Sequence, residues 1–356
     1  MKRSLALFLM VMSLLAGACG DDNDSSPTPG SEAVPSSLTI VAYDSFTLEP
    51  TAFDDFTKTT GIAVEVATAG DAGAMLSKAA LTAGNPEGDV MWGVDNTLLG
   101  RAIDSDVFTP YKSTELANLS EASKALVPDG EATPVDEGDV CVNYDKAWLA
   151  GKGLAVPTSL DDFTKPEYKD TLVVENPATS SPGLAFLLAT VAAYGDDGWT
   201  SYWEKLRENG VSVVDGWDQA YYEQFSGSSG KGPRPFVVSY GSSPPAEVIY
   251  ADPRPDEPPT GVVDSTCFHQ VEFAGILRGT AYPKAAGELI DYMVSKSFQQ
   301  LLPLSLFVYP ARTDATLPPE FNDFAVRPTQ PLAVSPAEIE AHSKDWIDAW
   351  TNIVLR

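Results

Sequence analysis

The stretch SLTIVAYDSF at residues 37–46 decides the fold, because a β-branched apolar run ends there at a short polar turn. The run predicts a buried strand. Apolar residues then recur at helical spacing over 53–60, and an alternating pattern over 62–67 predicts a second strand. A strand, a helix and a strand in this order indicate a βαβ unit with parallel strands.

The same alternation of strands and helices continues along the chain. A first series ends with a helix over 75–83 and a strand over 90–94, and a second series begins after residues 141–144. The predicted elements of the second series are strands over 172–174, 211–214, 236–240 and 266–276, and helices over 182–194, 199–208 and 284–302.

Extended segments near 137–144 and 262–273 join the two series. Two crossings of this kind predict an α/β protein of two lobes, with two mainly parallel sheets flanked by helices, a hinge and a cleft between the lobes. The predicted division is a first lobe of residues 38–137 plus 266–334 and a second lobe of residues 138–265.

The C-terminal segment 335–356 predicts a helix that packs onto a lobe. Its first residues, Ser335 to Glu338, form a capping box with proline at the first helical position. Trp346 and Trp350 recur on one face of this helix. A structural helix is favoured over a partner-binding surface.

Residues 1–19 have the pattern of an export signal, with two basic residues, an apolar run and then Ala-Gly-Ala before Cys19. The pattern predicts a lipoprotein signal peptide over 1–18, after which Cys19 is acylated and anchors the chain. A plain secretory signal is the alternative. The polar, Pro/Ser-rich residues 19–37 predict a flexible tether. We therefore expect an extracytoplasmic protein, lipid-anchored to the cell membrane or periplasmic.

The composition is that of a globular protein with an excess of acid. Of 356 residues, 44% are apolar and 21% charged, and the formal net charge is −27. Nucleic acid is not expected as a partner, because phosphate neutralisation needs clustered Lys and Arg. Solubility is the simplest explanation of the acid, and steering of a cation toward the protein is the alternative.

Two further cysteines, Cys141 and Cys267, lie in what we expect to be an oxidising compartment. Either a disulfide between them or two buried thiols fits the sequence. His269 and His342 are the only histidines, and no His-x-x-x-His or Cys-x-x-Cys spacing occurs. A conventional metal site is therefore not predicted.

The carboxyl ends of the predicted strands supply the first candidates for a binding site, because α/β sheets bind ligands there. Tyr43 and Asp44 end the first strand, and Asp95 and Asn96 follow the strand over 90–94. Each has an alternative role. Tyr43 could pack beneath a loop, and Asp95 and Asn96 could cap a helix.

Seven stretches between residue 38 and the C-terminus carry a family resemblance by their order and spacing. They are YDSF (43–46), DV with GVDNTLL (89–99), NYDK (143–146), TSSPGL (179–184), GW with AY (216–221), SY with SP (239–244) and VYP (308–310).

Together these stretches resemble the thiamine-binding subunit of bacterial thiamine ABC transporters, within the type II periplasmic binding proteins. The resemblance covers essentially the whole chain after the tether. It implies the two-lobed type II fold and a monomer that captures thiamine or thiamine phosphates and passes them to an ABC transporter permease. It implies neither enzymatic activity nor a cofactor.

Thiamine joins an aminopyrimidine to a permanently charged thiazolium, so its receptor needs aromatic faces and a carboxylate. Each aromatic ring over a fixed cation contributes about 0.5–2 kcal/mol. The resemblance places Tyr43, Trp217, Tyr221 and Tyr240 at the ligand. Trp217 also follows the end of a predicted strand, where a loop tryptophan either packs or binds.

Polar candidates surround these rings. Asp44, Asp95 and Asn96 could meet the cation or the pyrimidine amine, whereas Asp215 and Asp218 are more simply solvated loop acids.

Serines at two helix starts could contact a phosphate. Ser180 and Ser181 precede an apolar helix with proline in its first turn, and Ser242 stands before a second Ser-Pro. Helix starts present free amides and a positive dipole. The first stretch resembles the family's phosphate contact, although ordinary capping is the alternative for both.

Two positions depart from the family pattern. Ala246 stands where the family has an aromatic residue, and Phe307 stands where it has a tryptophan. One aromatic wall is thereby lost and another reduced, so we expect weaker binding or a related ligand such as a phosphate ester or a pyrimidine precursor.

Two other functions fit parts of the sequence. Ferric-binding proteins of the same fold use adjacent tyrosines, and Tyr221-Tyr222 is such a pair, although helical spacing puts them on different faces. A thiamine-degrading transferase resembles this fold and uses a cysteine nucleophile, for which Cys141 is the candidate. Cys141 lies inside an alternating strand, which favours a structural thiol or a disulfide.

Overall fold

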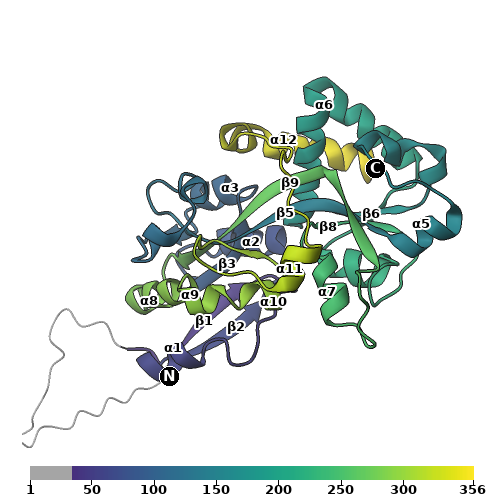
Figure 1. Cartoon of the computed structure of the whole chain (residues 1–356). Coiled ribbons are helices and arrows are strands. Elements are labelled where there is room, and N and C mark those ends of the chain that lie inside the picture. Colours follow the sequence, from purple (N-terminus) through teal and green to yellow (C-terminus); the bar gives the residue numbers. More distant parts are fainter. Residues whose placement is uncertain (1–33) are drawn as a thin grey trace, which may run out of the picture. The chain divides into compact units, whose positions relative to one another are not determined.

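A βαβ unit opens the part of the chain that the structure describes. The structure is a computed structural model, and it describes residues 34–356 (Figure 1). β1 (Ser37–Ala42) and β2 (Ala63–Thr68) are parallel neighbours joined through α1 (Asp54–Thr60). The predicted signal peptide over 1–18, Cys19 and most of the predicted tether lie outside the described residues.

The remaining elements follow in an α/β order. The strands are β3 (Val90–Asp95), β4 (Phe108–Thr109), β5 (Thr133–Asp145), β6 (Leu172–Glu175), β7 (Ser212–Val214), β8 (Phe236–Tyr240), β9 (Thr260–Leu277) and β10 (Tyr309–Pro310). The helices are α2 (Ala72–Leu81), α3 (Leu99–Asp104), α4 (Glu121–Lys124), α5 (Lys146–Lys152), α6 (Ser181–Glu208), α7 (Pro244–Ile249), α8 (Pro283–Met293), α9 (Lys296–Gln299), α10 (Leu302–Ser305), α11 (Pro319–Phe324) and α12 (Pro336–Val354). Short turns of other helix types are η1 (Leu116–Asn118), η2 (Leu160–Thr164), η3 (Pro166–Tyr168) and the π-helical η4 (Gln219–Gln224).

The strands form one mixed sheet, in which eight follow the order β2-β1-β3-β9-β5-β8-β6-β7, while β4 pairs with β9 and β10 with β5 beside this path. The strands at each end are parallel, and we call β2-β1-β3 the first arm and β8-β6-β7 the second arm. The long antiparallel strands β5 and β9 connect the arms (Figure 1). The two predicted crossings are therefore paired strands, and the two predicted sheets are continuous through them.

Helices cover both faces of each arm. In the first arm, Leu38 and Ile40 share a core with α8, whereas Val41 shares a core with α2. In the second arm, α6 covers one face and η4 the other. β3 is buried along its whole length, as expected of a parallel strand with helices on both sides.

Two predicted helices differ from the structure. The helices over 182–194 and 199–208 run together as α6, which bends at Gly195 (φ 66°, ψ −179°). The helix predicted over 284–302 is divided into α8, α9 and α10. Ser295 begins α9 as its cap, since its hydroxyl accepts a hydrogen bond from the Phe298 N–H.

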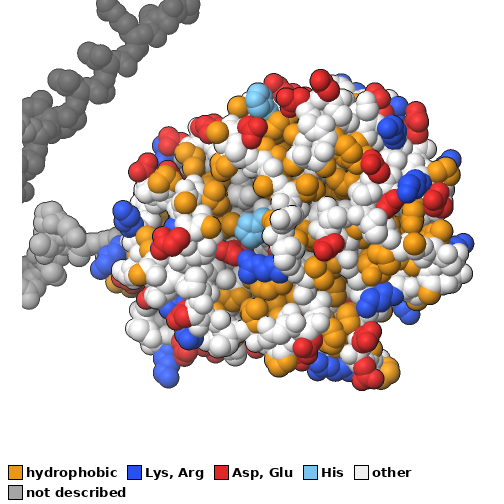
Figure 2. All heavy atoms as spheres, turned by 45° about the horizontal axis from the view of Figure 1, so that its top comes forward, with side chains coloured by type: hydrophobic (Ala, Val, Ile, Leu, Met, Phe, Trp, Pro, Cys, Tyr) orange, Lys and Arg blue, Asp and Glu red, His pale blue; other side chains and the backbone are white. Residues whose placement is uncertain are grey.

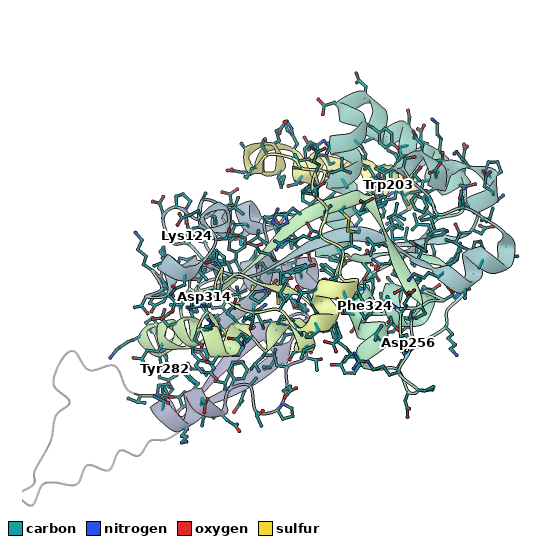
Figure 3. All side chains as sticks on the ribbon, viewed as in Figure 1. Lys124, Trp203, Asp256, Tyr282, Asp314 and Phe324 are labelled. Carbon is teal, nitrogen blue, oxygen red and sulfur yellow. A yellow bond between two sulfur atoms is a disulfide. The ribbon has the colours of Figure 1, made fainter. Side chains whose placement is uncertain are left out.

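α12 begins at the capping box and packs on α6. The Ser335 hydroxyl accepts from the Glu338 N–H, and the Glu338 carboxylate accepts from the Ser335 N–H. Trp350 is fully buried with its ring centroid 5.5 Å from that of Trp203. Trp203 lies where α6 approaches α12 (Figure 3).

A disulfide joins Cys141 of β5 to Cys267 of β9. It lies where the β5–β9 ladder is irregular, because Val140 pairs with Phe268 while Val142 pairs with Val263. Of the two alternatives that the sequence left open for these cysteines, the structure therefore has the disulfide.

Charged side chains of both signs are interspersed on the face shown in Figure 2. Within residues 34–356, no helix has the length and apolar character needed to span a membrane. The same residues contain no group of three or more His, Cys, Asp or Glu side chains placed to hold a metal ion.

Candidate functional site

A cavity of about 560 Å³ opens between residues of both arms. Its size is typical of a small-molecule site. Aromatic side chains from five segments line it, namely Tyr43, Trp217, Tyr222, Tyr240, Tyr250 and Phe307. Six of the residues proposed from the sequence meet here: Tyr43, Asp44, Ser181, Trp217, Tyr240 and Phe307.

Trp217 is held by three contacts that fix the plane of its ring. Its backbone N–H donates to the Asp71 carboxylate over 2.8 Å, and its indole Nε1–H donates to the Ser239 hydroxyl over 2.9 Å. The ring stacks on Tyr221 at 4.8 Å between centroids and 15° between planes. Tyr221 thus covers one face of the Trp217 ring, and the Trp217 side chain lines the cavity.

Tyr43 reaches the cavity from the end of β1. Its ring packs on β3 at Gly93, where a Cβ would come within 2.3 Å of the ring and where φ is +106°. Only glycine suits both conditions. The Tyr43 hydroxyl donates to Glu272 Oε2 over 3.4 Å. Burial and the neighbouring Glu272 carboxylate raise the pKa of Tyr43 well above its usual value, so the phenol stays neutral.

Tyr240 ends β8 beside Trp217, with 6.4 Å between their ring centroids. Its pKa is also raised well above its usual value, first by burial and then by Glu272. The two neutral phenols and the indole offer aromatic faces and hydroxyls to a ligand without bringing a charge of their own.

Asp95 and Asn96 do not line this cavity, because both are used by the backbone around them. Asp95 Oδ1 accepts from the N–H groups of Thr97 and Leu98, and Oδ2 accepts from the Gln270 amide. Asn96 accepts from the Val271 N–H and donates to the His269 carbonyl, which ties the end of β3 to β9. Asp95 thus satisfies the backbone of the turn before α3, whereas Asn96 joins two strands and caps no helix; the cap position of α3 is Leu98.

Three other sequence candidates lie outside the lining. Tyr221 is behind Trp217 and donates to Glu247 over 2.9 Å. Ser180 occupies the N-cap position of α6, and its side chain is buried. Ser242 is fully buried before α7. Of the proposed serines, Ser181 alone lines the cavity.

Among the lining residues that the sequence did not propose are Asp71, Tyr250 and Glu272. Tyr222, proposed only as an iron ligand, and Asp218, interpreted as a solvated loop acid, also line the cavity. Asp71 caps α2 and follows the end of β2, so the strand-end rule applied to β2 would have found it. Tyr250 follows Ala246 by four positions at the end of α7 and restores an aromatic ring near the position where the family pattern is lost. Glu272 lies inside β9, and no local pattern distinguishes it.

Tyr250 and Phe307 form one edge of the cavity. Their ring centroids are 5.7 Å apart, and Phe307 also stacks on Phe321 at 6.2 Å. The Tyr250 hydroxyl donates to the Leu304 carbonyl over 3.2 Å, which links the end of α7 to α10. Tyr250 is otherwise 70% exposed, so this bond limits its motion.

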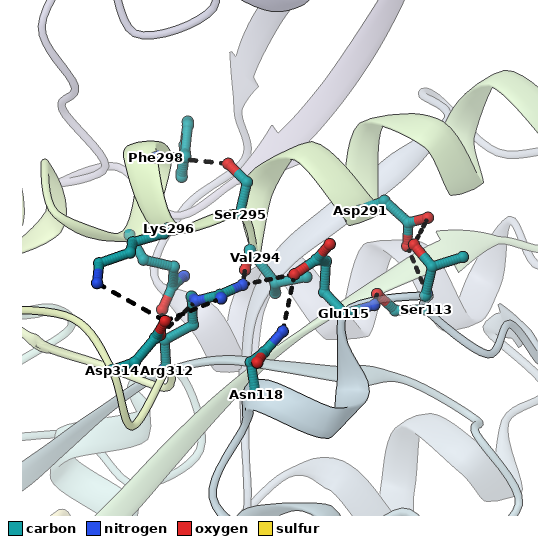
Figure 4. Close-up of polar contacts among 12 residues, drawn as sticks. Ser113, Glu115, Asn118, Asp291, Val294, Ser295, Lys296, Phe298, Arg312 and Asp314 are labelled. Atoms are coloured by element: carbon teal, nitrogen blue, oxygen red, sulfur yellow. Dashed lines mark hydrogen bonds and ion pairs between the residues drawn. The ribbon is translucent and has the colours of Figure 1, made fainter.

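Arg312 fixes the segment that follows β10, a few residues after Phe307. Its buried guanidinium donates to Asp314, to Glu115 over 2.6 Å and to the Val294 carbonyl over 3.1 Å (Figure 4). These partners lie on three separate segments, so the chain on the C-terminal side of β10 is held in place.

The tyrosine pair proposed for iron does not aim both phenols at the cavity. The rings of Tyr221 and Tyr222 are nearly perpendicular at 86°, and Tyr221 is bonded to Glu247. Cys141, the candidate nucleophile, is in a disulfide, so it has no thiol to react.

The sequence and the fold were compared with known proteins. The model of the family described as bacterial extracellular solute-binding protein matches residues 86–339. This chain belongs to that family. The thiamine-binding periplasmic protein of Salmonella typhimurium strain LT2 is 30% identical over 327 residues, which cover 90% of this chain and 94% of that protein.

Solved structures agree on the fold of this solute-binding protein. A structure described as a periplasmic thiamin binding protein is 27% identical, with a TM-score of 0.77, and the match covers 90% of this chain and 96% of that one. The ferric binding protein from Campylobacter jejuni matches with a TM-score of 0.69 over 89% of this chain and 99% of that one, but it is 19% identical and shows the fold alone. The predicted α/β fold of the type II periplasmic binding proteins is confirmed.

Proposed function

We propose that this solute-binding protein captures thiamine or a thiamine phosphate outside the cytoplasm and passes it to an ABC transporter permease. The observation that carries the proposal is the meeting of Tyr43, Trp217 and Tyr240 around one cavity with the Glu272 carboxylate on its lining. Neutral aromatic faces beside a carboxylate suit a flat heterocycle with a fixed positive charge. The named relatives support the same ligand.

The preference of the protein for thiamine or a thiamine phosphate depends on the part of the cavity lining where α2 and α6 begin. Ser181 and the start of α6 offer a hydroxyl and free amides to a phosphate. The Asp71 carboxylate lies on the same lining and would repel it. We propose that thiamine itself is bound at least as tightly as its phosphates.

The test of the proposed function is direct binding to the purified protein. Adding thiamine should quench tryptophan fluorescence in a saturable way, because a ring stacked on Trp217 lies within contact distance of the indole. Thiamine monophosphate titrated in parallel gives the preference among phosphorylation states. Mass spectrometry of ligand retained after gentle purification identifies the natural compound. Ferric ion binding without any response to thiamine would contradict the proposal.

We also propose that the protein acts as a monomer, without catalysis or a cofactor, and that Cys19 carries the lipid anchor. The anchor proposal depends on Ala-Gly-Ala-Cys at residues 16–19. Thiamine recovered intact after incubation with the protein and a nucleophilic amine is the expected result. Release of the thiazole would instead favour a transferase.

Loss of the Tyr250 hydroxyl should speed ligand release. In Tyr250→Phe the ring stays on the cavity edge, but its 3.2 Å bond to the Leu304 carbonyl is lost. One hydrogen bond contributes about 0.5–1.5 kcal/mol, so we expect the dissociation rate of thiamine to rise about two- to tenfold. Stopped-flow fluorescence measures this rate. A dissociation rate equal to that of the wild type would show that the bond does not retain the ligand.

A further inference from the structure

Glu272 and Asp136 form a buried pair of carboxyl groups at the cavity. They are direct cross-strand partners on the neighbouring strands β9 and β5, so their side chains lie on the same face of the sheet. Glu272 lines the cavity and is 6% exposed, whereas Asp136 lies behind it at 1%. Asp136 Oδ2 accepts from the Trp92 indole over 3.2 Å, but its Oδ1 is buried without a hydrogen-bond partner.

Two buried carboxyl groups at directly opposite positions of neighbouring strands disfavour each other's ionised form. Burial raises the pKa of Asp136 to about 7. Burial, and then the charge of Asp136, raises the pKa of Glu272 well above its usual value. A proton held between the two groups would also satisfy the unpartnered Asp136 oxygen.

The groups that face the pair offer no positive charge to replace that proton. Asp95 comes from β3, Tyr43 from the end of β1 and Tyr240 from β8, while Glu137 adjoins Asp136 on β5. The Trp92 indole is a neutral donor. Within residues 34–356, the groups that most strongly shift the pKa of either carboxyl include no Lys, Arg or His.

We propose that the Glu272–Asp136 pair is the counter-charge for the ligand, and that a cationic ligand binds by displacing the proton that the two carboxyl groups share. The inference rests on the proposed function and adds a selection rule to it. Glu272 loses its O–H proton to the solvent as the ligand cation takes its place, so the net charge of the site changes little. A neutral analogue cannot make this exchange and must leave the pair protonated.

The direction of the pH dependence follows from this exchange. The cation stabilises the ionised pair, so it binds more tightly where the pair has already lost its proton. Affinity should therefore rise between pH 6 and pH 8.5 and level off once the pair is ionised in the free protein. With one proton exchanged, the rise is at most about tenfold per pH unit.

Isothermal titration calorimetry with thiamine tests the exchange. Titrations at one pH in phosphate and in Tris, whose ionisation enthalpies differ, give the number of protons released. We expect release that approaches about one proton per thiamine near pH 7, and none with the uncharged pyrimidine half of thiamine. Tight thiamine binding without proton release from pH 6 to pH 8.5 would overturn the inference. No thiamine binding at all would instead overturn the proposed function.

Three variants test whether the proton release comes from the Glu272–Asp136 pair or from other acidic residues of the protein. Glu272→Gln should abolish proton release and weaken thiamine binding at pH 8 about five- to tenfold, because the counter-charge is gone. Asp136→Asn keeps the Glu272 charge and supplies an amide donor to it, so binding at pH 6 should be tighter than in the wild type. Proton release that persists in both variants would overturn the inference.

Glu65→Gln is the control on the same sheet. Glu65 lies on β2, is exposed, does not line the cavity and is not among the groups that most strongly shift the pKa of either carboxyl. This variant should release the same number of protons as the wild type, with an affinity within about twofold. A loss of release in this variant as large as that in Glu272→Gln would show that the pair has no special role.

Discussion

Trp217→Ala should weaken thiamine binding about ten- to hundredfold. A tryptophan that contacts a ligand from a fixed position commonly contributes about 2 kcal/mol or more, and Trp217 is fixed by Asp71, Ser239 and the ring of Tyr221. Fluorescence titration or calorimetry measures the change. Most of the loss in affinity should appear as a faster dissociation rate, because the Trp217 ring contacts the ligand only after it has entered the cavity.

The controls for Trp217 distinguish stacking from folding. Trp217→Phe keeps an aromatic face but loses the bond to Ser239, so we expect a smaller loss than in Trp217→Ala. Trp148→Phe changes a half-buried tryptophan that packs on Phe236, away from the cavity lining, and should bind as the wild type does. An unchanged affinity in Trp217→Ala would show that Trp217 does not contact the ligand, and the proposed function would lose its main aromatic contact.

Local patterns predicted the arms of the fold and the positions of Tyr43 and Trp217 after strand ends, whereas the family resemblance placed Tyr240 at the ligand. Tyr43 follows β1, Tyr240 ends β8 and Trp217 follows β7, and strand ends gather at one edge of an α/β sheet. The same rule fails for Asp95, because a short acid at that place can satisfy the backbone of its own turn. The position of a residue after a strand therefore identifies candidates for the site, but it does not distinguish residues that bind a ligand from residues that satisfy the backbone of their own turn.

Pairing across the sheet could not be predicted locally. Glu272 and Asp136 are far apart in the sequence, and their meeting depends on the register between β5 and β9. Tyr250 becomes part of the cavity only because α7 lies near α10. The break between α8 and α9 depends on a single serine cap at Ser295, which helical periodicity does not detect.

The disulfide lies in the two-strand ladder that connects the arms of the sheet. β5 and β9 are the only strands of the described sheet that connect the first arm to the second. The cross-link between Cys141 and Cys267 lies within this connection, and β9 of the same connection also supplies Glu272 to the cavity lining. The two strands are thereby tied covalently where the arms join, without a sulfur atom on the cavity lining.

Removal of that disulfide should lower the free energy of unfolding by about 2–5 kcal/mol. The two cysteines are 126 positions apart, so the bond excludes many extended conformations of the unfolded chain. Urea unfolding of the double variant Cys141→Ala/Cys267→Ala, monitored by circular dichroism, measures the decrease in the free energy of unfolding. The slope of the transition should also rise, since the unfolded chain is less compact without the cross-link.

Reduction separates the bond from the side chains that form it. Dithiothreitol should destabilise the wild type toward the level of the double variant and should leave the double variant unchanged. At low urea, where both proteins are folded, thiamine affinity should stay within about threefold, because neither cysteine lines the cavity. Thiol titration verifies that the disulfide is fully reduced. If the fully reduced wild type is as stable as the oxidised protein, the disulfide does not stabilise the fold. A selective loss of thiamine binding in the folded double variant would instead show that the cross-link shapes the cavity.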